Sequence, residues 1–304
     1  MTDLDLTTVS LLRMEATAAH KAVERLKESI ESGDLYQALQ LFKTQHARAK
    51  KKGDIAQAVE LAYRGANVML EKGEVNAGSE LARDFVELVK SQPDFDYDKV
   101  VQEIIIIDGH FAKLEGSEAS REQKRFLKVA VDFTTERGPW PTGEPELHRI
   151  IALAALKDSD LLLAMKHMLH SHHPDEIVKI ITKWAKSGPE NERDLYLTRT
   201  VLQLLCLENL RDANAVNKGF REEFPDLDTP LTRFVGFLLR TLERDAYPLF
   251  MTLRQKYAPS LARGNTPQSS FDAYLDKIAQ VYYNVAPPKS GMASMMESLM
   301  KGMF

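Results

Sequence analysis

The part of this chain best suited to bind a metal ion is a histidine-rich segment, HMLHSHHPDE. It carries four histidines followed by two acids, namely His167, His170, His172, His173, Asp175 and Glu176. His167 and His170 stand three residues apart, so on a helix they would share one face, a spacing that suits two metal ligands. Pro174 follows directly and puts His172 and His173 in a turn, where no third ligand is aimed at the same point. Because histidine is also favoured at the C-terminal end of a helix dipole, a solvated helix end explains the segment at least as well, and we predict no bound metal.

No other segment carries a recognisable catalytic motif. The sequence has no phosphate-binding glycine loop, no GxSxG, no HExxH and no paired CxxC. Its single cysteine, Cys206, lies in the apolar run VLQLLCLENL, where a small buried side chain is a better explanation than a nucleophile. One thiol cannot build a disulfide framework, which favours a reducing compartment. We therefore expect no enzyme and no cofactor.

A second charged segment, HARAKKKGD, gathers cations at the end of a predicted helix: His46, Arg48, Lys50, Lys51 and Lys52. Two interpretations stay open. The cations could simply solvate a helix end, where the dipole favours them, or they could form a basic patch that matches an acidic partner. No aromatic residues alternate with the lysines and the net charge is −4, so nucleic acid is not an expected partner.

The elements that position these residues repeat along the chain. Three segments align without adjustment, each opening with a glycine and an acid: GDLYQALQ from Gly33, GDIAQAVE from Gly53 and GEVNAGSE from Gly73. Within each unit of 20 residues, apolar and small residues follow the i, i+3, i+4, i+7 spacing of a helix. Glycine suits the end of one helix and the following acid suits the start of the next, so each unit is predicted to be a helix and a short turn. A small residue recurs in each helix and would let neighbouring helices approach closely: Ala38, Ala58 and Gly78.

Helical patterning continues through nearly the whole chain, with no sustained alternation of period two. Two units make a hairpin of about 40 residues, close to the tetratricopeptide repeat (TPR) length. Such hairpins cannot bury both faces alone, so they stack. The sequence thus predicts an all-α, TPR-like α-solenoid of stacked helical hairpins. The N-terminus lacks the build of a signal peptide, and the longest aliphatic run, 104–107, is too short to cross a bilayer, so we expect a cytosolic protein without membrane insertion.

Three irregular stretches interrupt the helical pattern. RGPWPTGEPE, at 137–146, has three prolines and two glycines and marks a bend between an N-terminal half, 1–140, and a C-terminal half, 141–304. EFPDLDTPLTR, at 223–233, is the one place where we allow strands, as a short β-hairpin.

A third irregular stretch, APPKSGM at 286–292, precedes a methionine-rich tail, 290–304. Apolar residues of the tail follow helical spacing: Met292, Met295, Met296, Leu299, Met300 and Met303. One lysine and one glutamate are too few charges for a membrane-surface helix. We expect the tail to dock on the solenoid or on a partner.

Several longer segments together resemble a known family. LYQALQLFKTQHARAKKKGDIAQAVELAYRGANVML and the following GSELARDFVELVK resemble the N-terminal half of the scaffold subunit of the Get pathway, called the TRC pathway in animals. LHRIIALAALKDSDLLLAMKHMLHS, FVGFLLRTLERDAYPLFMTLRQKYAPSL and YLDKIAQVYYNVAPPKSG resemble later parts of the same family, in the right order. No single motif is diagnostic; the resemblance rests on the collinear set, which spans roughly residues 20 to 300.

The resemblance implies a non-catalytic cytosolic adaptor in the post-translational delivery of tail-anchored membrane proteins to the endoplasmic reticulum. Such a protein would hold a ubiquitin-like co-chaperone tightly through its C-terminal half. Through its N-terminal half it would recruit the targeting ATPase transiently. Whether a larger, animal-type co-chaperone joins them stays open.

The resemblance also implies which residues face the ATPase: Tyr36, Lys43, Arg48, Glu80 and Glu87. The family typically has an aspartate at the first acidic position, where Glu80 keeps the charge but adds a methylene. Tyr36 could instead be an aromatic that packs between helices.

For the ubiquitin-like partner, the resemblance points to the last helices and the irregular stretch before them, which in this chain is EFPDLDTPLTRFVGFLL. Its apolar stripe supplies the predicted contacts: Leu231, Phe234, Phe237 and Leu238. Packing in the core is the alternative for each of them.

Two other functions compete with the adaptor. A generic helical-repeat scaffold, such as a subunit of a proteasome-lid-like or trafficking complex, would share the repeat but not the collinear C-terminal match. A metal-dependent hydrolase centred on the histidine segment is the alternative from a different class.

Overall fold

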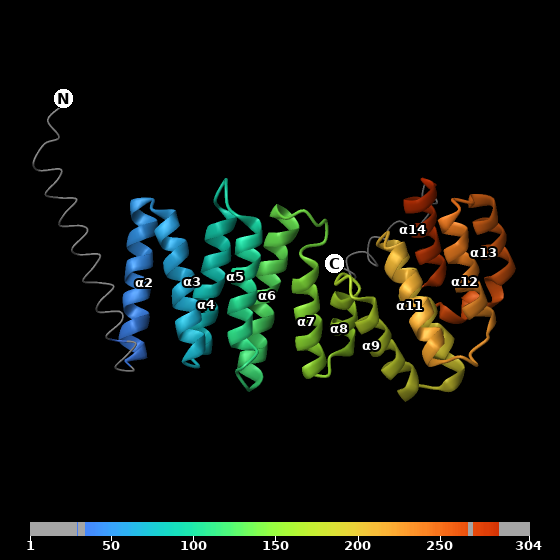
Figure 1. The fold of residues 1–304 in the computed structure, drawn as a ribbon, viewed down its shortest axis with the longest axis horizontal. Helices are drawn as coiled ribbons and strands as arrows, with labels where there is room; N and C mark the ends of the chain where they lie inside the picture. The colour runs from blue at the N-terminus through green and yellow to red at the C-terminus, as the bar shows by residue number, and fades with distance from the viewer. Residues whose placement is uncertain (1–28, 30–33, 267–269, 286–304) are drawn as a thin grey trace, which may run out of the picture. The chain divides into compact units, whose positions relative to one another are not determined.

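The computed structural model describes Ser29 and residues 34–266 and 270–285 (Figure 1), so the methionine-rich tail lies outside the described residues. Helices make up the regular structure of the described part, which confirms the all-α solenoid class. None of the described helices is both long and apolar enough to span a membrane. The chain divides into two compact units, Met1–Leu147 and His148–Phe304.

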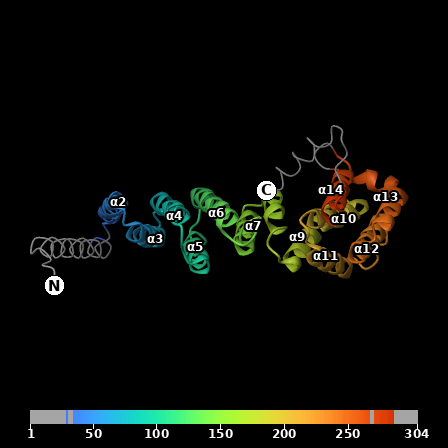
Figure 2. The same cartoon turned by 90° about the horizontal axis from the view of Figure 1, so that it is seen from above.

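The first unit arranges its helices in two layers. Its helices are α2 (Leu35–Lys52), α3 (Ile55–Glu71), α4 (Val75–Lys90), α5 (Tyr97–Phe111) and α6 (Ser117–Arg137). Figure 2 shows α2, α4 and α6 in one row and α3 and α5 in the other. Residues on α2, α4 and α6 therefore share one side of this unit.

The turns between the first helices follow the predicted glycine–acid rule. Gly53 ends α2 with φ at 75°, the left-handed conformation that costs glycine no Cβ clash. The side chains of Asp34 and Asp54 each accept a hydrogen bond from a backbone N–H three residues on, at 3.0 and 3.1 Å. Glu74 stands at the third such position but makes no capping bond, since its longer side chain is a poorer cap.

The recurring small residues lie where helices meet closely, as predicted. Ala38 and Ala58 are fully buried. A Cβ on Gly78 would lie only 2.5 Å from Cγ of Leu70, so any side chain there would collide with α3. The 20-residue period therefore sets the spacing between stacked helices.

The second unit is built around α10 (Arg193–Cys206), most of whose residues are buried. The unit also contains α8 (Leu161–Met168), α9 (Pro174–Ser187), α11 (Leu210–Glu223), α12 (Pro230–Glu243), α13 (Tyr247–Leu261) and α14 (Phe271–Tyr283), and α7 (Pro145–Lys157) crosses the division between the units. Helices α9, α11, α12 and α14 all pack against α10. The second unit has one continuous hydrophobic core, with residues from α7 through α14.

The predicted β-hairpin at 223–233 is wrong, because no strand forms there. The stretch ends α11 at Glu223 and starts α12 at Pro230. Thr229 caps α12 in a reciprocal pair with Thr232, and Pro230 takes the first helical position, where its missing N–H costs nothing. Pro230, one of the two prolines that made the stretch look irregular, thus serves a helix start.

Candidate protein-binding surfaces

The five residues predicted to face an ATPase lie on α2 and α4, and we call this set the charged edge. Tyr36 is 76% exposed, so it does not pack between helices. Arg48, Glu80 and Glu87 are also exposed. The structure brings two of the five together, because Nζ of Lys43 lies 2.7 Å from Oε2 of Glu80.

His46 is not part of the basic segment in which the sequence placed it. Its side chain is buried, with Nδ1 3.9 Å from Oδ2 of Asp84. Burial lowers the pKa of His46, and Lys50 adds to this, although the charge of Asp84 opposes it. The imidazole is therefore neutral at pH 7. The remaining cations of the segment, Arg48 and Lys50 to Lys52, are exposed near the end of α2.

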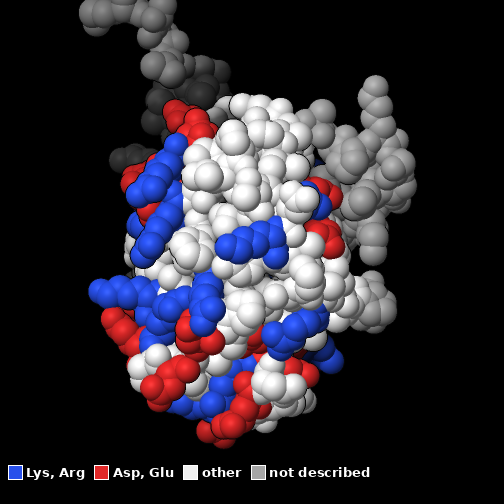
Figure 3. All heavy atoms as spheres, turned by 90° about the vertical axis from the view of Figure 1, so that its right-hand side faces the viewer, with Lys and Arg blue, Asp and Glu red and all other residues white. Residues whose placement is uncertain are grey.

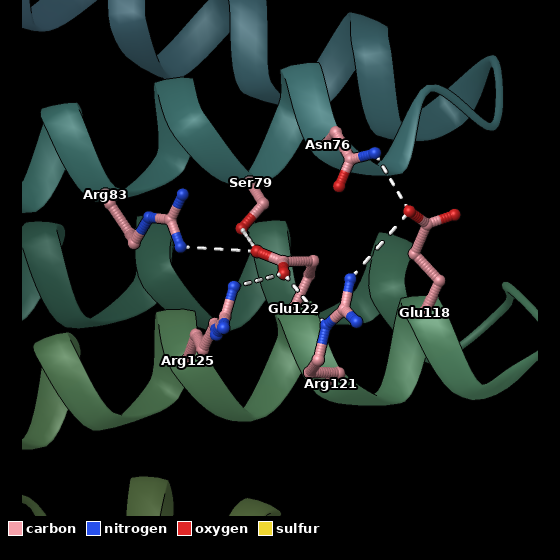
Figure 4. Close-up of polar contacts among 7 residues, drawn as sticks. All are labelled: Asn76, Ser79, Arg83, Glu118, Arg121, Glu122 and Arg125. Carbon is pink, nitrogen blue, oxygen red and sulfur yellow. Dashed lines mark hydrogen bonds and ion pairs between the residues drawn. The ribbon is translucent and has the colours of Figure 1, made fainter.

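Polar contacts also connect α4 to α6, on the same side of the unit (Figure 4). Nδ2 of Asn76 donates to Glu118 at 2.9 Å, and farther along Nζ of Lys90 lies 2.7 Å from Oε1 of Glu136. Between them stands Glu122, whose side chain is almost fully buried. The layer is thus held together by ion pairs as well as by apolar packing.

Glu122 is surrounded by donors. Ser79 Oγ lies 3.1 Å from its carboxylate, and three guanidinium groups lie between 2.8 and 3.4 Å: those of Arg83, Arg121 and Arg125. Burial alone would raise the pKa of Glu122, but the Ser79 hydrogen bond and the arginine charges outweigh it and hold the pKa below its usual range. Sequence reasoning missed this cluster, since Ser79 and Arg83 lie about forty positions away from Glu122; the one local signal was the Arg121–Glu122–Arg125 spacing.

The stripe predicted to hold a ubiquitin-like partner is mostly core. Leu231, Phe234 and Leu238 are buried, and the prediction that they form a surface contact is corrected here. Helix α12 packs against α10, α11 and α13, so these side chains point into the second unit. Phe237 alone is exposed, at 46%.

Phe237 lies in a groove of about 610 Å³ between α11 and α12. Four cations line the groove, together with a single acid, Glu243. The cations are Lys218, Arg221, Arg233 and Arg240. We call this feature the α11–α12 groove.

Helix α13 presents a different surface. Only Phe250 and Leu261 of this helix are fully buried, while Leu249 and Met251 are 52% and 44% exposed. Figure 3 views the side of the second unit that carries α13 and shows a wide area of residues other than Lys, Arg, Asp and Glu, with a few cations inside it and at its margins. We call the surface around Leu249 and Met251 the α13 face.

Two of the residues that the sequence singled out for chemistry, His170 and Cys206, are buried. His170 is buried and His167 is half-buried, so these two do not form a fully solvated helix end. Both rings contact the ring of His148 in tilted arrangements, with centroids 5.0 and 4.9 Å away. Burial lowers the pKa of His167 to about 4. Within the part of the chain that the structure describes, no group of three or more metal-binding side chains has suitable geometry. Cys206 is buried, and burial raises the pKa of its thiol to about 12, so it is a core residue rather than a nucleophile.

Comparison with known proteins agrees on one family. The profile of the family GET4, described as Golgi to ER traffic protein 4, matches residues 52–304. A Golgi to ER traffic protein 4 homolog from Dictyostelium discoideum is 32% identical, over 93% of this chain and 90% of that protein. Protein GET4 of Arabidopsis thaliana is 28% identical, over 90% of this chain and 93% of that protein.

A solved structure has the same fold. The crystal structure of C. therm. Get4 superimposes with a TM-score of 0.74, over 92% of this chain and 95% of that one. At 24% identity this likeness concerns the fold alone. The match of residues 52–304 to the family profile, and a relative 32% identical over nearly its full length, show that this chain belongs to the Get4 family, Golgi to ER traffic protein 4.

Proposed function

We propose that this chain is a non-catalytic cytosolic adaptor that joins a ubiquitin-like co-chaperone to the ATPase that targets tail-anchored membrane proteins. Its family is a scaffold family of the Get pathway. The observation that carries the finer proposal is that the two compact units expose surfaces of different chemistry. The first unit has the charged edge, and the second has the exposed apolar side chains of Leu249 and Met251 on α13.

The charged edge suits a partner that binds and leaves quickly. Charges at the surface attract a complementary partner from a distance, and salt screens them. Lys43 and Glu80 are paired with each other but partly exposed, so the pair stabilises the fold by only about 0.2–1 kcal/mol and opens easily. A partner can therefore take over either charge at small cost.

A charge swap separates binding from folding. In the Lys43→Glu, Glu80→Lys double variant the internal pair is kept, but the charges that a partner meets are reversed. We expect normal stability, loss of ATPase recruitment and an unchanged ubiquitin-like partner in a pull-down from cytosol at low salt. The matched control is Lys90→Glu with Glu136→Lys, a pair of the same 2.7 Å length on α4 and α6. If the ATPase still binds the first swap as well as the control, the charged edge is not its site.

The α13 face suits a partner that stays bound, because apolar burial does not weaken as salt rises. We assign the ubiquitin-like partner to the exposed side chains of Leu249 and Met251. Leu249→Asp with Met251→Asp should release this partner at every salt concentration. Leu162→Asp makes the same kind of change at an exposed leucine of α8, in the same unit, and should not.

The same pull-down tests the role as a whole. Recovery of a ubiquitin-like protein at low and moderate salt, with an ATPase lost as salt rises, is the expected result. Recovery of lid or coat subunits in place of both would favour the generic scaffold.

A further inference from the structure

The α11–α12 groove has the room and the polar groups to hold an extended segment of polypeptide. It is about 610 Å³ in volume and is walled by α11 on one side and α12 on the other. Gly236 leaves room on the α12 side, because a Cβ there would meet no atom closer than 3.9 Å, the distance to Nη2 of Arg221. Asn214 and Asn217 supply half-buried amides that can bond to a backbone.

The charges that line the groove are mostly positive. Two of its cations are engaged: Arg233 forms a two-pronged pair with Asp228 at 2.8 and 2.6 Å, and Arg221 donates to the carbonyl of Thr232 at 2.6 Å. The other two are available. Among the described residues Lys218 pairs only with Glu222, at 4.0 Å, and both side chains are largely exposed. Arg240 makes no ion pair with any residue that the structure describes.

An exposed aromatic ring stands in the middle of these cations. Arg233, Phe237 and Arg240 occupy positions i, i+4 and i+7 of α12, so they follow one another along one face of the helix. Phe237 is 46% exposed, while the neighbouring Phe234 and Leu238 are buried. The groove therefore offers one apolar contact with a guanidinium on either side.

We propose that the α11–α12 groove binds an acidic segment of a partner protein that places one large apolar side chain on Phe237, between carboxylates that pair with Lys218 and Arg240. Charge complementarity identifies the occupant, because the lining has four cations and one acid. Nucleic acid is the weaker match, since the groove offers one aromatic ring and no row of stacking platforms. This proposal goes beyond the adaptor role and makes no use of the α13 face or the charged edge.

Fluorescence anisotropy with the full-length chain tests the proposal directly. The probe is a fluorescein-labelled peptide with one phenylalanine flanked by glutamates. Two control peptides replace the glutamates by glutamines or the phenylalanine by serine. Both controls should bind more weakly than the probe, and the affinity for the probe should fall as salt rises.

Variants of the chain locate the site. Arg240→Ala should weaken binding about two- to fivefold, as expected for one exposed ion pair. Lys218→Glu with Arg240→Glu should weaken it about tenfold or more, and Gly236→Gln should weaken it by filling the α12 side without changing charge. Lys256→Ala removes an exposed cation of α13 and serves as the control.

Several results would overturn the proposal. One is no binding of the glutamate probe at low salt; another is equal binding of the glutamine control. If Lys256→Ala weakens probe binding as much as Arg240→Ala does, the probe is attracted by general charge only. If an RNA oligonucleotide displaces the probe at a lower concentration than unlabelled peptide does, the groove is a polyanion site. None of these results depends on whether the ATPase or the ubiquitin-like partner binds elsewhere.

Discussion

Replacing Glu122 with glutamine tests whether the arginine cluster between α4 and α6 stabilises the first unit. Removing one partner of a fully buried ion pair costs about 3–5 kcal/mol, and an exposed pair contributes about 0.2–1 kcal/mol. Glu122 is 4% exposed but its arginines are 33%, 58% and 60% exposed, so water can solvate them again. The glutamine oxygen also still accepts hydrogen bonds. We therefore expect a loss of about 1–3 kcal/mol, or about 2–10 °C in Tm.

Urea unfolding, with amide hydrogen exchange in α4 and α6 to localise the effect, measures this loss. Glu118→Gln is the matched control, because Glu118 lies one turn earlier on the same helix and is 56% exposed. This substitution should change the free energy of unfolding by less than about 0.5 kcal/mol. A loss in Glu122→Gln no larger than in the control would refute the reasoning.

The effect of Glu122→Gln on the free energy of unfolding should also depend on pH. Because the pKa of Glu122 is held below its usual range, its stabilisation is complete above the unfolded value of about 4.3 and is lost as pH falls through the folded value. The difference in unfolding free energy between the wild type and Glu122→Gln should therefore be largest near neutral pH and shrink in acid. A difference that stays constant on acidification would contradict a stabilising carboxylate charge.

Two further predictions concern packing and histidine. Gly78→Ala should destabilise the chain by about 1 kcal/mol, because the new Cβ collides with Leu70. Gly109→Ala, with open space around the new Cβ, should stabilise the chain by about 0.5–1 kcal/mol. Equal denaturation midpoints for the two variants would refute the close approach of α3 and α4. Burial lowers the pKa of His167 from 6.5 to about 4, so the folded form resists protonation and the second unit should lose stability as pH falls from about 6.5 toward 4. His167→Gln should flatten this loss, as measured by hydrogen exchange in α7 to α9, and an unchanged pH profile would show that another group titrates.

Features that depend on residues close in sequence were predictable. A capping aspartate and the N–H that it binds are three residues apart, and a left-handed glycine acts on its own peptide. The helix turns, the 20-residue period and the solenoid class therefore follow from local chemistry, as does the burial of Cys206 in an apolar run.

Features that depend on how helices pack were not predictable. A core stripe and a docking stripe on α12 have the same helical spacing, and only its packing against α10, α11 and α13 separates buried Phe234 from exposed Phe237. Proline-rich sequence at 223–233 is compatible with a hairpin or with a helix start, and the capping pair with Thr232 decides for the helix.

The sequence by itself determined a stack of helices, the turns between them and the collinear pattern of the Get4 family, because each depends on residue types at short spacing. Only the tertiary structure decided which charges meet. Lys43 pairs with Glu80 across 37 positions and Arg83 with Glu122 across 39. The 20-residue period stacks the helices but does not specify which of their side chains meet. The same is true of the α11–α12 groove, whose cations come from two helices and share one surface only after the helices pack. Burial and long-range electrostatics belong to the packed chain, and for that reason the binding surfaces had to be read from the fold.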